Sequence, residues 1–191
     1  MKIFIAGPRA ISSLNSKIED RLHGIYVKGY SVLVGDANGV DTAIQRYFSH
    51  LNYANVTVYA SNGNARNNLG NWRIEAVPVP SNIKGFDFYA IKDKAMAKNA
   101  DYGFMLWNGE SKGTLNNIIN LLNHNKKALV YFSPRNSFIC IDSFESLETL
   151  VSYCDDVAKT LFNKLYKKIN MLQTQMTIFQ GLSPKEQHLF L

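Results

Sequence analysis

Short apolar runs alternate with amphipathic stretches along the first 142 residues of the chain. The runs are rich in β-branched and aromatic residues and predict buried strands, at residues 2–6, 31–34, 56–59, 102–107 and 127–132. Between them, apolar residues spaced three and four apart predict helices, at residues 13–28, 41–51, 89–99 and 114–123. A last run at 138–141 is a candidate sixth strand at an edge. The alternation predicts an α/β fold in three layers, with a mostly parallel sheet of five or six strands.

Two segments depart from this rhythm. Residues 60–88 are rich in Asn, Gly and Pro without an apolar period, which predicts a loop that serves as a lid, a binding loop or an interface arm. Residues after 142 are helical in pattern and carry two apolar stripes, Leu147, Leu150, Val151 and Cys154, then Val157, Leu161, Leu165, Ile169, Leu172 and Met176. The stripes either pack on the domain or form a homodimer contact through residues 143–180. We therefore predict a domain at 1–142 and a C-terminal helical extension at 143–191.

Composition excludes several classes of protein. The chain has 191 residues, of which 46% are hydrophobic and 19% charged, which supports one domain with a sizeable core. Its apolar runs are shorter than the ~20 residues of a membrane span, and the first is too short for a secretory signal, so we expect no membrane association and a cytoplasmic location. Cys140 and Cys154 have no metal-ligand spacing, so we expect buried thiols and neither a metal nor a cofactor.

The formal net charge of +6 lies in one part of the chain. Residues 1–142 hold 16 Lys and Arg against 10 Asp and Glu, whereas residues 143–191 hold 5 of each sign. A positive excess favours an anionic ligand or nucleic acid. Because the basic residues are scattered rather than clustered, nucleic acid is the secondary interpretation.

Unusual residues gather after the predicted strands, in loops 7–9, 35–41, 61–68 and 107–114. Carboxyl ends of parallel strands meet at one edge of the sheet, where ligands bind in such folds, so the loops should form one site. The last loop precedes a helix, whose free amides and dipole favour a phosphate. The candidate ligand-binding residues are Gly7, Pro8, Arg9, Gly35, Asp36, Gly39, Arg66, Asn67, Trp72, Trp107, Gly109, Ser111, Gly113 and Thr114.

Each candidate also has a purely structural interpretation. The glycines serve turns, Asp41 and Thr114 serve as helix caps, and the two tryptophans serve as packing residues. The sequence contains neither the G-x-G-x-x-G dinucleotide fingerprint nor a P-loop. The prediction of a site therefore depends on several loops meeting at one place.

Five segments together resemble the SLOG superfamily of DNA-processing protein A and lonely-guy type domains, most closely its YspA/YpsA-like branch: residues 4–9, 35–41, 92–96, 100–101 and 107–114. The resemblance covers about residues 1–135 and implies a Rossmann-like domain that binds nucleotides or nucleotide-derived ligands. It implies that Gly113 and Thr114 hold phosphate. The phosphoribohydrolases of this superfamily have a Glu where this chain has Asn117, and an amide cannot act as a carboxylate base or nucleophile.

Three functions follow as hypotheses. The first is binding of a nucleotide or an ADP-ribose-like or NAD-like molecule, by a sensor or sequestering module in which Trp72 or Trp107 stacks on the base. The second is cleavage or transfer at an N-glycosidic bond, with candidate acids Asp36, Asp41, Asp93 and Glu110. The third is binding of single-stranded nucleic acid, which the net charge favours.

Overall fold

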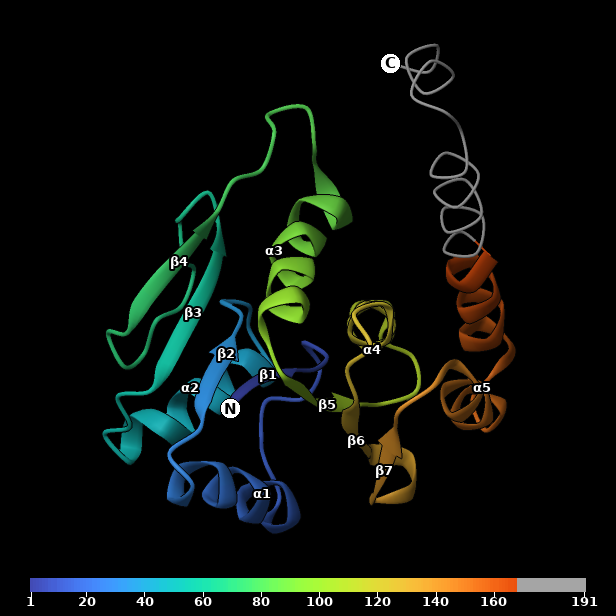
Figure 1. The fold of residues 1–191 in the computed structure, drawn as a ribbon, viewed down its shortest axis with the longest axis horizontal. Helices are drawn as coiled ribbons and strands as arrows, with labels where there is room; N and C mark the ends of the chain where they lie inside the picture. The colour runs from blue at the N-terminus through green and yellow to red at the C-terminus, as the bar shows by residue number, and fades with distance from the viewer. Residues whose placement is uncertain (168–191) are drawn as a thin grey trace, which may run out of the picture.

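The computed structural model describes residues 1–167, which form one sheet with helices on both faces (Figure 1). The strands are β1 Lys2–Ala6, β2 Ser31–Val34, β3 Val56–Ser61, β4 Arg73–Val77, β5 Tyr102–Trp107, β6 Ala128–Phe132 and β7 Ser137–Ile141. The helices are α1 Ser16–Val27, α2 Val40–His50, α3 Gly85–Asn99, α4 Lys112–Asn123 and α5 Phe144–Ser152, with a 3₁₀ turn at Ser133–Arg135 and a helical run at 156–167.

The strand order β4-β3-β2-β1-β5-β6-β7 makes β1 a central strand. All neighbours pair in parallel except β6 and β7, which are antiparallel. The chain moves outward from β1 to β4 and then returns through α3 to β5 on the other side of β1. The point where the order reverses, between β1 and β5, is where loops diverge and leave a crevice in Rossmann-like folds.

The sheet separates two apolar clusters because successive strand residues point to opposite faces. Ile3 and Ile5 of β1 pack with α1 and α2, whereas Phe4 of the same strand packs with α3, α4 and α5. Helices therefore cover both faces, as Figure 1 shows. Both faces of the central strands are buried, which explains their continuous apolar runs.

The structure confirms the predicted α/β fold class and shows a Rossmann-like fold, with one strand more than the sequence predicts. The additional strand, β4, lies within residues 60–88 and pairs with β3 at the edge of the sheet. Arg73 and Ile74 are exposed, so this strand has no apolar pattern to reveal it. Strand β4 is held by hydrogen bonds from its parallel neighbour β3. The antiparallel edge strand β7 agrees with the run predicted at 138–141.

Of the residues after 142, those in the described range 143–167 pack on the sheet face that α3 and α4 cover. Leu147, Leu150 and Val151 of α5 are buried in that cluster, together with Phe162 of the run at 156–167. Within the second predicted stripe, Leu161 and Leu165 pack against the same cluster, but Val157 is 75% exposed and does not belong to the packed face. Ile169, Leu172 and Met176 lie outside the described residues.

Two further expectations can be compared with the described residues 1–167. Cys140 is exposed and Cys154 is half-buried, so the expectation of buried thiols is wrong for Cys140, whose strand β7 is an edge. In this part of the chain, no helix is both long and apolar enough to cross a membrane.

Candidate functional site

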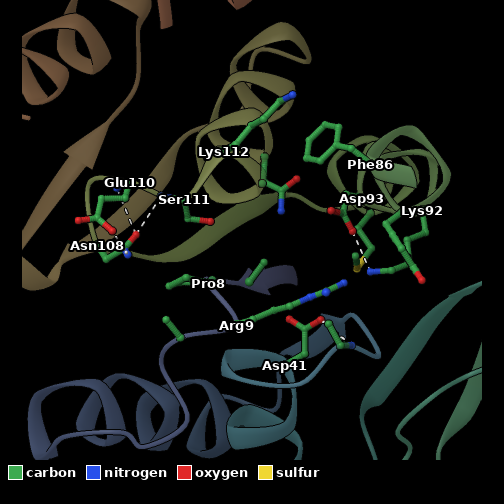
Figure 2. Close-up of a pocket in the computed structure, with 18 of the residues that line it drawn as sticks. Pro8, Arg9, Asp41, Phe86, Lys92, Asp93, Asn108, Glu110, Ser111 and Lys112 are labelled. Atoms are coloured by element: carbon green, nitrogen blue, oxygen red, sulfur yellow. Dashed lines mark hydrogen bonds and ion pairs between the residues drawn. The ribbon is translucent and has the colours of Figure 1, made fainter. Parts of the chain in front are cut away.

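A cavity of about 640 Å³ opens where the strand order reverses. Most of its lining comes from the loop after β1, the loop between β5 and α4 with the start of α4, and α3. Ala37 from the loop after β2, Asp41 from the first turn of α2, and Arg66 from the loop after β3 complete it. Figure 2 shows Arg9, Asp41, Lys92 and Asp93 converging from different elements on one side of it, with Asn108, Glu110 and Ser111 on the other. A volume of this size lies within the range of small-molecule sites.

Lys92 stands at the centre of a buried charge cluster. Its ammonium is 2.9 Å from Oδ1 of Asp93 and 3.7 Å from Oδ1 of Asp36, and its side chain is only 4% exposed. Asp36 in turn accepts two side-chain hydrogen bonds from Arg66, at 3.0 Å from Nε and 2.8 Å from Nη2, and a third from its backbone amide. These contacts join the loop after β2, α3 and the loop after β3 at the cavity.

Burial and charge act in opposite directions on this cluster. Burial alone raises the pKa of Asp36, but hydrogen bonds from Arg66 and the charge of Lys92 bring the pKa below its ordinary value. Burial raises the pKa of Asp41 to about 6, because Lys92 offsets only part of the desolvation. The pKa of Lys92 is raised despite burial, because Asp93 and Asp41 favour its charged form. Asp36 and Lys92 are therefore charged at neutral pH, whereas Asp41 titrates in the range useful for general acid–base chemistry.

Two glycines permit this close packing. A Cβ at Gly35 would stand 2.3 Å from Oδ2 of Asp41 and 2.7 Å from Nζ of Lys92. A Cβ at Gly7 would stand 2.6 Å from Cγ2 of Val40 and 2.8 Å from the backbone oxygen of Leu106. At Gly7 the neighbouring atoms include backbone that cannot move aside, so this position requires glycine, whereas a side chain at Gly35 would force the charged ends of Asp41 and Lys92 to shift.

The loop before α4 is capped by its own side chains. Oδ1 of Asn108 accepts from the amides of Glu110 and Ser111, at 3.2 and 3.0 Å. Oγ of Ser111 accepts from the amide of Thr114 at 3.3 Å and from its hydroxyl at 2.9 Å. Among residues 1–167, the amides of Lys112 and Gly113 have no hydrogen-bond partner in this turn, and both residues line the cavity.

This geometry changes the interpretation of two predicted caps. Thr114 is not the cap of α4, because the helix begins at Lys112 and Ser111 is its N-cap. Asp41 does not cap α2, because the N-cap of that helix is Gly39. The Asp41 carboxylate instead accepts a hydrogen bond from the amide of Ala37 at 3.1 Å. Thr114 is almost fully buried and lies behind the turn, outside the cavity lining.

The structure brings part of the predicted site together. The predicted ligand and acid residues that line the cavity are Gly7, Pro8, Arg9, Asp41, Arg66, Asp93, Glu110, Ser111 and Gly113. Those that lie outside its lining are Gly35, Asp36, Gly39, Asn67, Trp72, Trp107, Gly109 and Thr114. Asp36 borders a second, smaller cavity of about 160 Å³, which Arg66 and Tyr89 share with the first.

Neither tryptophan is placed to stack on a ligand in the cavity. Trp107 is fully buried, and its indole Nε1 donates to the backbone oxygen of Ser111 at 3.2 Å. Trp72 borders a different groove, and its Nε1 donates to the backbone oxygen of Tyr53 at 2.7 Å. Both indoles therefore serve the packing role that tryptophan more often has.

Several lining residues escape the sequence prediction. Phe86, Tyr89 and Lys92 come from α3. The sequence could have indicated Lys92, because it lies four residues before the buried Met96 and therefore on the core-facing side of the helix. A lysine at such a position has to find carboxylate partners. Asn117 also lines the cavity and is 4% exposed, and its Oδ1 has no hydrogen-bond partner among the described residues.

The cavity lining combines four cations with three carboxylates. The cations are Arg9, Arg66, Lys92 and Lys112, and the carboxylates are Asp41, Asp93 and Glu110. Among residues 1–167, Arg9 and Lys112 form no ion pair, so they remain available to an anion. In the same part of the chain, no three His, Cys, Asp or Glu side chains are grouped as a metal site would need.

By sequence, the chain matches no protein-family model and no curated protein. By structure, it is similar to DNA processing protein A from Helicobacter pylori, with a TM-score of 0.55 and 12% sequence identity over 88% of this chain and 81% of that one. That protein binds single-stranded DNA. At this identity the likeness establishes a shared Rossmann-like fold.

Proposed function

We propose that this protein binds a nucleotide or a nucleotide-derived, ADP-ribose-like or NAD-like ligand in the cavity between β1 and β5. The observation that carries the proposal is what gathers at the fold's ligand-binding crevice. Arg9 and Lys112 have no ion-pair partner within residues 1–167, and the amides of Lys112 and Gly113 at the start of α4 have no hydrogen-bond partner within the same residues. We further propose that the chain belongs to the SLOG superfamily and to its YspA/YpsA-like branch. Four of the five resembling segments lie at or near this crevice, whereas residues 100–101 precede β5, at the opposite edge of the sheet. The likeness to DNA processing protein A supports the assignment.

Calorimetry with ADP-ribose and adenosine monophosphate tests this proposal. The wild type should bind at least one of them. Arg9→Gln should weaken binding about 12- to 140-fold, because a charge-assisted hydrogen bond contributes about 1.5–3 kcal/mol. Arg46→Gln is the matched control, since Arg46 is exposed on α2 away from the cavity. Absence of heat with both ligands, or equal weakening in both variants, would contradict the proposal.

Asn117 supports binding of the nucleotide without its hydrolysis. Its amide lines the cavity at the position where the resemblance implies a carboxylate. The alternative, an N-glycosidic hydrolase or transferase, has one favourable observation: Asp41 lines the cavity and has a pKa of about 6. Chromatography after prolonged incubation of ADP-ribose with micromolar protein separates the two. We expect intact nucleotide; released base that disappears in Asp41→Asn would establish the enzyme.

Binding of single-stranded nucleic acid is the second alternative. The structural neighbour binds single-stranded DNA, and residues 1–142 carry the whole net charge of +6. Such binding releases counterions, so its affinity should fall steeply with salt. A titration of a labelled oligonucleotide at 50 and 200 mM salt measures this slope, and no binding at the lower concentration would end the alternative.

The division of the chain at residue 142 and a homodimer through residues 143–180 remain proposals. Tyr153 and Val157 support the dimer, because they expose apolar side chains, at 53% and 75%, on the surface of this region. Sedimentation of the wild type and of Val157→Glu tests it. A dimer that becomes a monomer in the variant is the expected result, and a wild-type monomer at all concentrations would refute it.

A further inference from the structure

Two exposed aromatic side chains project from α3 at the edge of the cavity. Phe86 is 40% exposed and Tyr89 is 37% exposed, and both line the cavity. They are three residues apart, so they lie on neighbouring parts of one helix face. Other large apolar side chains with comparable exposure, such as Val27 and Val157, lie elsewhere on the surface. The concentration of open aromatic surface at the cavity therefore calls for an explanation of its own.

Cationic side chains lie over both of these rings. The ammonium of Lys112 lies 4.3 Å from the ring centroid of Phe86 (Figure 2). The guanidinium carbon of Arg66 lies 4.5 Å from the ring centroid of Tyr89, and that of Arg9 lies 5.6 Å from it. Arg66 is fixed by Asp36, but Arg9 and Lys112 have no ion-pair partner within residues 1–167. These two long side chains can turn away to an incoming phosphate and free ring surface at the same time.

The rings and the first turn of α4 lie side by side, so one ligand could place its base on the rings and its phosphate at the turn. Lys112 lies in the first turn of α4, and its ammonium lies over the Phe86 ring. A phosphate at the α4 turn would therefore draw the Lys112 ammonium off the ring beside it. Aromatic rings stack on nucleobases without regard to base identity, because every base has a π face.

We propose that Phe86, flanked by Tyr89, is the stacking platform for the heterocyclic base of the ligand, while Arg9, Lys112 and the amides of Lys112 and Gly113 receive its phosphate. The inference rests on the proposed function and deepens it. The ligand must carry a base as well as a phosphate, so a sugar phosphate alone is a poor ligand. The stacking residues are aromatic side chains of α3 and not either tryptophan.

The test compares adenosine 5′-monophosphate, ribose 5-phosphate and a short single-stranded oligodeoxyadenylate by calorimetry. The wild type should bind the mononucleotide about 5- to 140-fold more tightly than ribose 5-phosphate, the range that stacking at about 1–3 kcal/mol per base gives. Phe86→Leu should remove most of this difference while leaving the affinity for ribose 5-phosphate within about twofold. Tyr89→Leu should have a smaller effect of the same kind.

Tyr153→Leu is the matched control. Tyr153 is also an exposed aromatic side chain beneath a guanidinium, that of Arg135 at 3.6 Å, but it lies outside the cavity. Its loss should change neither affinity. Because Phe86 and Tyr153 are both exposed, circular dichroism and thermal melting should show that each variant folds as the wild type does.

The outcomes separate this inference from the proposed function. Equal affinity of the wild type for the mononucleotide and ribose 5-phosphate, or equal loss of both in Phe86→Leu, would overturn the stacking platform while leaving the phosphate site intact. No binding of any of the three probes would overturn both. A Phe86-dependent oligonucleotide complex tighter than the mononucleotide complex would support stacking and identify a nucleic-acid strand as the source of the base.

Discussion

Asp41→Asn should stabilise the protein at neutral pH. The carboxylate of Asp41 is buried, and burial is the main cause that raises its pKa from 3.8 to about 6. A difference of this size corresponds to about 3 kcal/mol against the charged form, at ~1.4 kcal/mol per pH unit. Asparagine keeps the oxygen that accepts from the amide of Ala37 but carries no charge. The variant should therefore gain up to about 3 kcal/mol in the free energy of unfolding near pH 7.5.

The gain in the free energy of unfolding should depend on pH in a way that identifies Asp41 as its source. Because the pKa of Asp41 is higher in the folded protein than in the unfolded chain, the folded state binds more protons between about pH 4 and pH 6. The stability of the wild type should fall as the pH rises through this window, whereas the variant lacks that contribution. The difference between the two proteins should vanish toward pH 4 and reach its full value above about pH 7.

Urea unfolding of both proteins at pH 4.5, 6 and 7.5 measures the effect. Asp142→Asn is the control, because Asp142 is half exposed and its contact with Lys127, at 3.6 Å, is a surface pair worth about 0–1 kcal/mol. A loss of stability in Asp41→Asn at pH 7.5, or a gain of the same size at all three pH values, would refute the electrostatic reasoning. The confirmed result would show that this carboxylate costs stability, as residues retained for function often do.

Three further substitutions have clear expected outcomes in urea unfolding. Gly7→Ala should cost about 1–3 kcal/mol because its Cβ meets fixed atoms, whereas Gly113→Ala, which has open space around it, should change stability by less than about 0.5 kcal/mol; equal effects would contradict this. Ser111→Ala should cost about 1 kcal/mol, since it removes the side-chain cap of α4, and an unchanged midpoint would contradict it. Arg66→Met should cost about 1–2 kcal/mol at pH 7, reduced because Arg66 is one-third exposed. That cost should shrink as the pH falls and Asp36 becomes protonated, because Arg66 is what holds the pKa of this buried carboxyl below its ordinary value, and a cost independent of pH would contradict it.

The position at which α3 begins explains why the sequence prediction misses Phe86. α3 begins at Gly85, four residues before the predicted helix, so Phe86 fell into the segment interpreted as a loop. The aromatic and glycine residues there gave no apolar period, and the helix forms in the context of the sheet it packs against. Trp107 is predicted to lie in the site but is fully buried. It stands at the end of a buried strand, and its position in the pleat points its side chain toward the core.

The sequence by itself determined the layered α/β fold and the edge of the sheet at which the loops gather. Strand and helix periods depend on neighbours within a few residues, and parallel strands place their carboxyl ends together whatever their order. Tertiary structure alone decided which side chains face the cavity and which charges meet. Asp36 and Arg66 are 30 residues apart. Lys92 of α3 contacts both Asp36, in the loop after β2, and its own neighbour Asp93. Such contacts depend on strand order and helix placement, which no local pattern encodes.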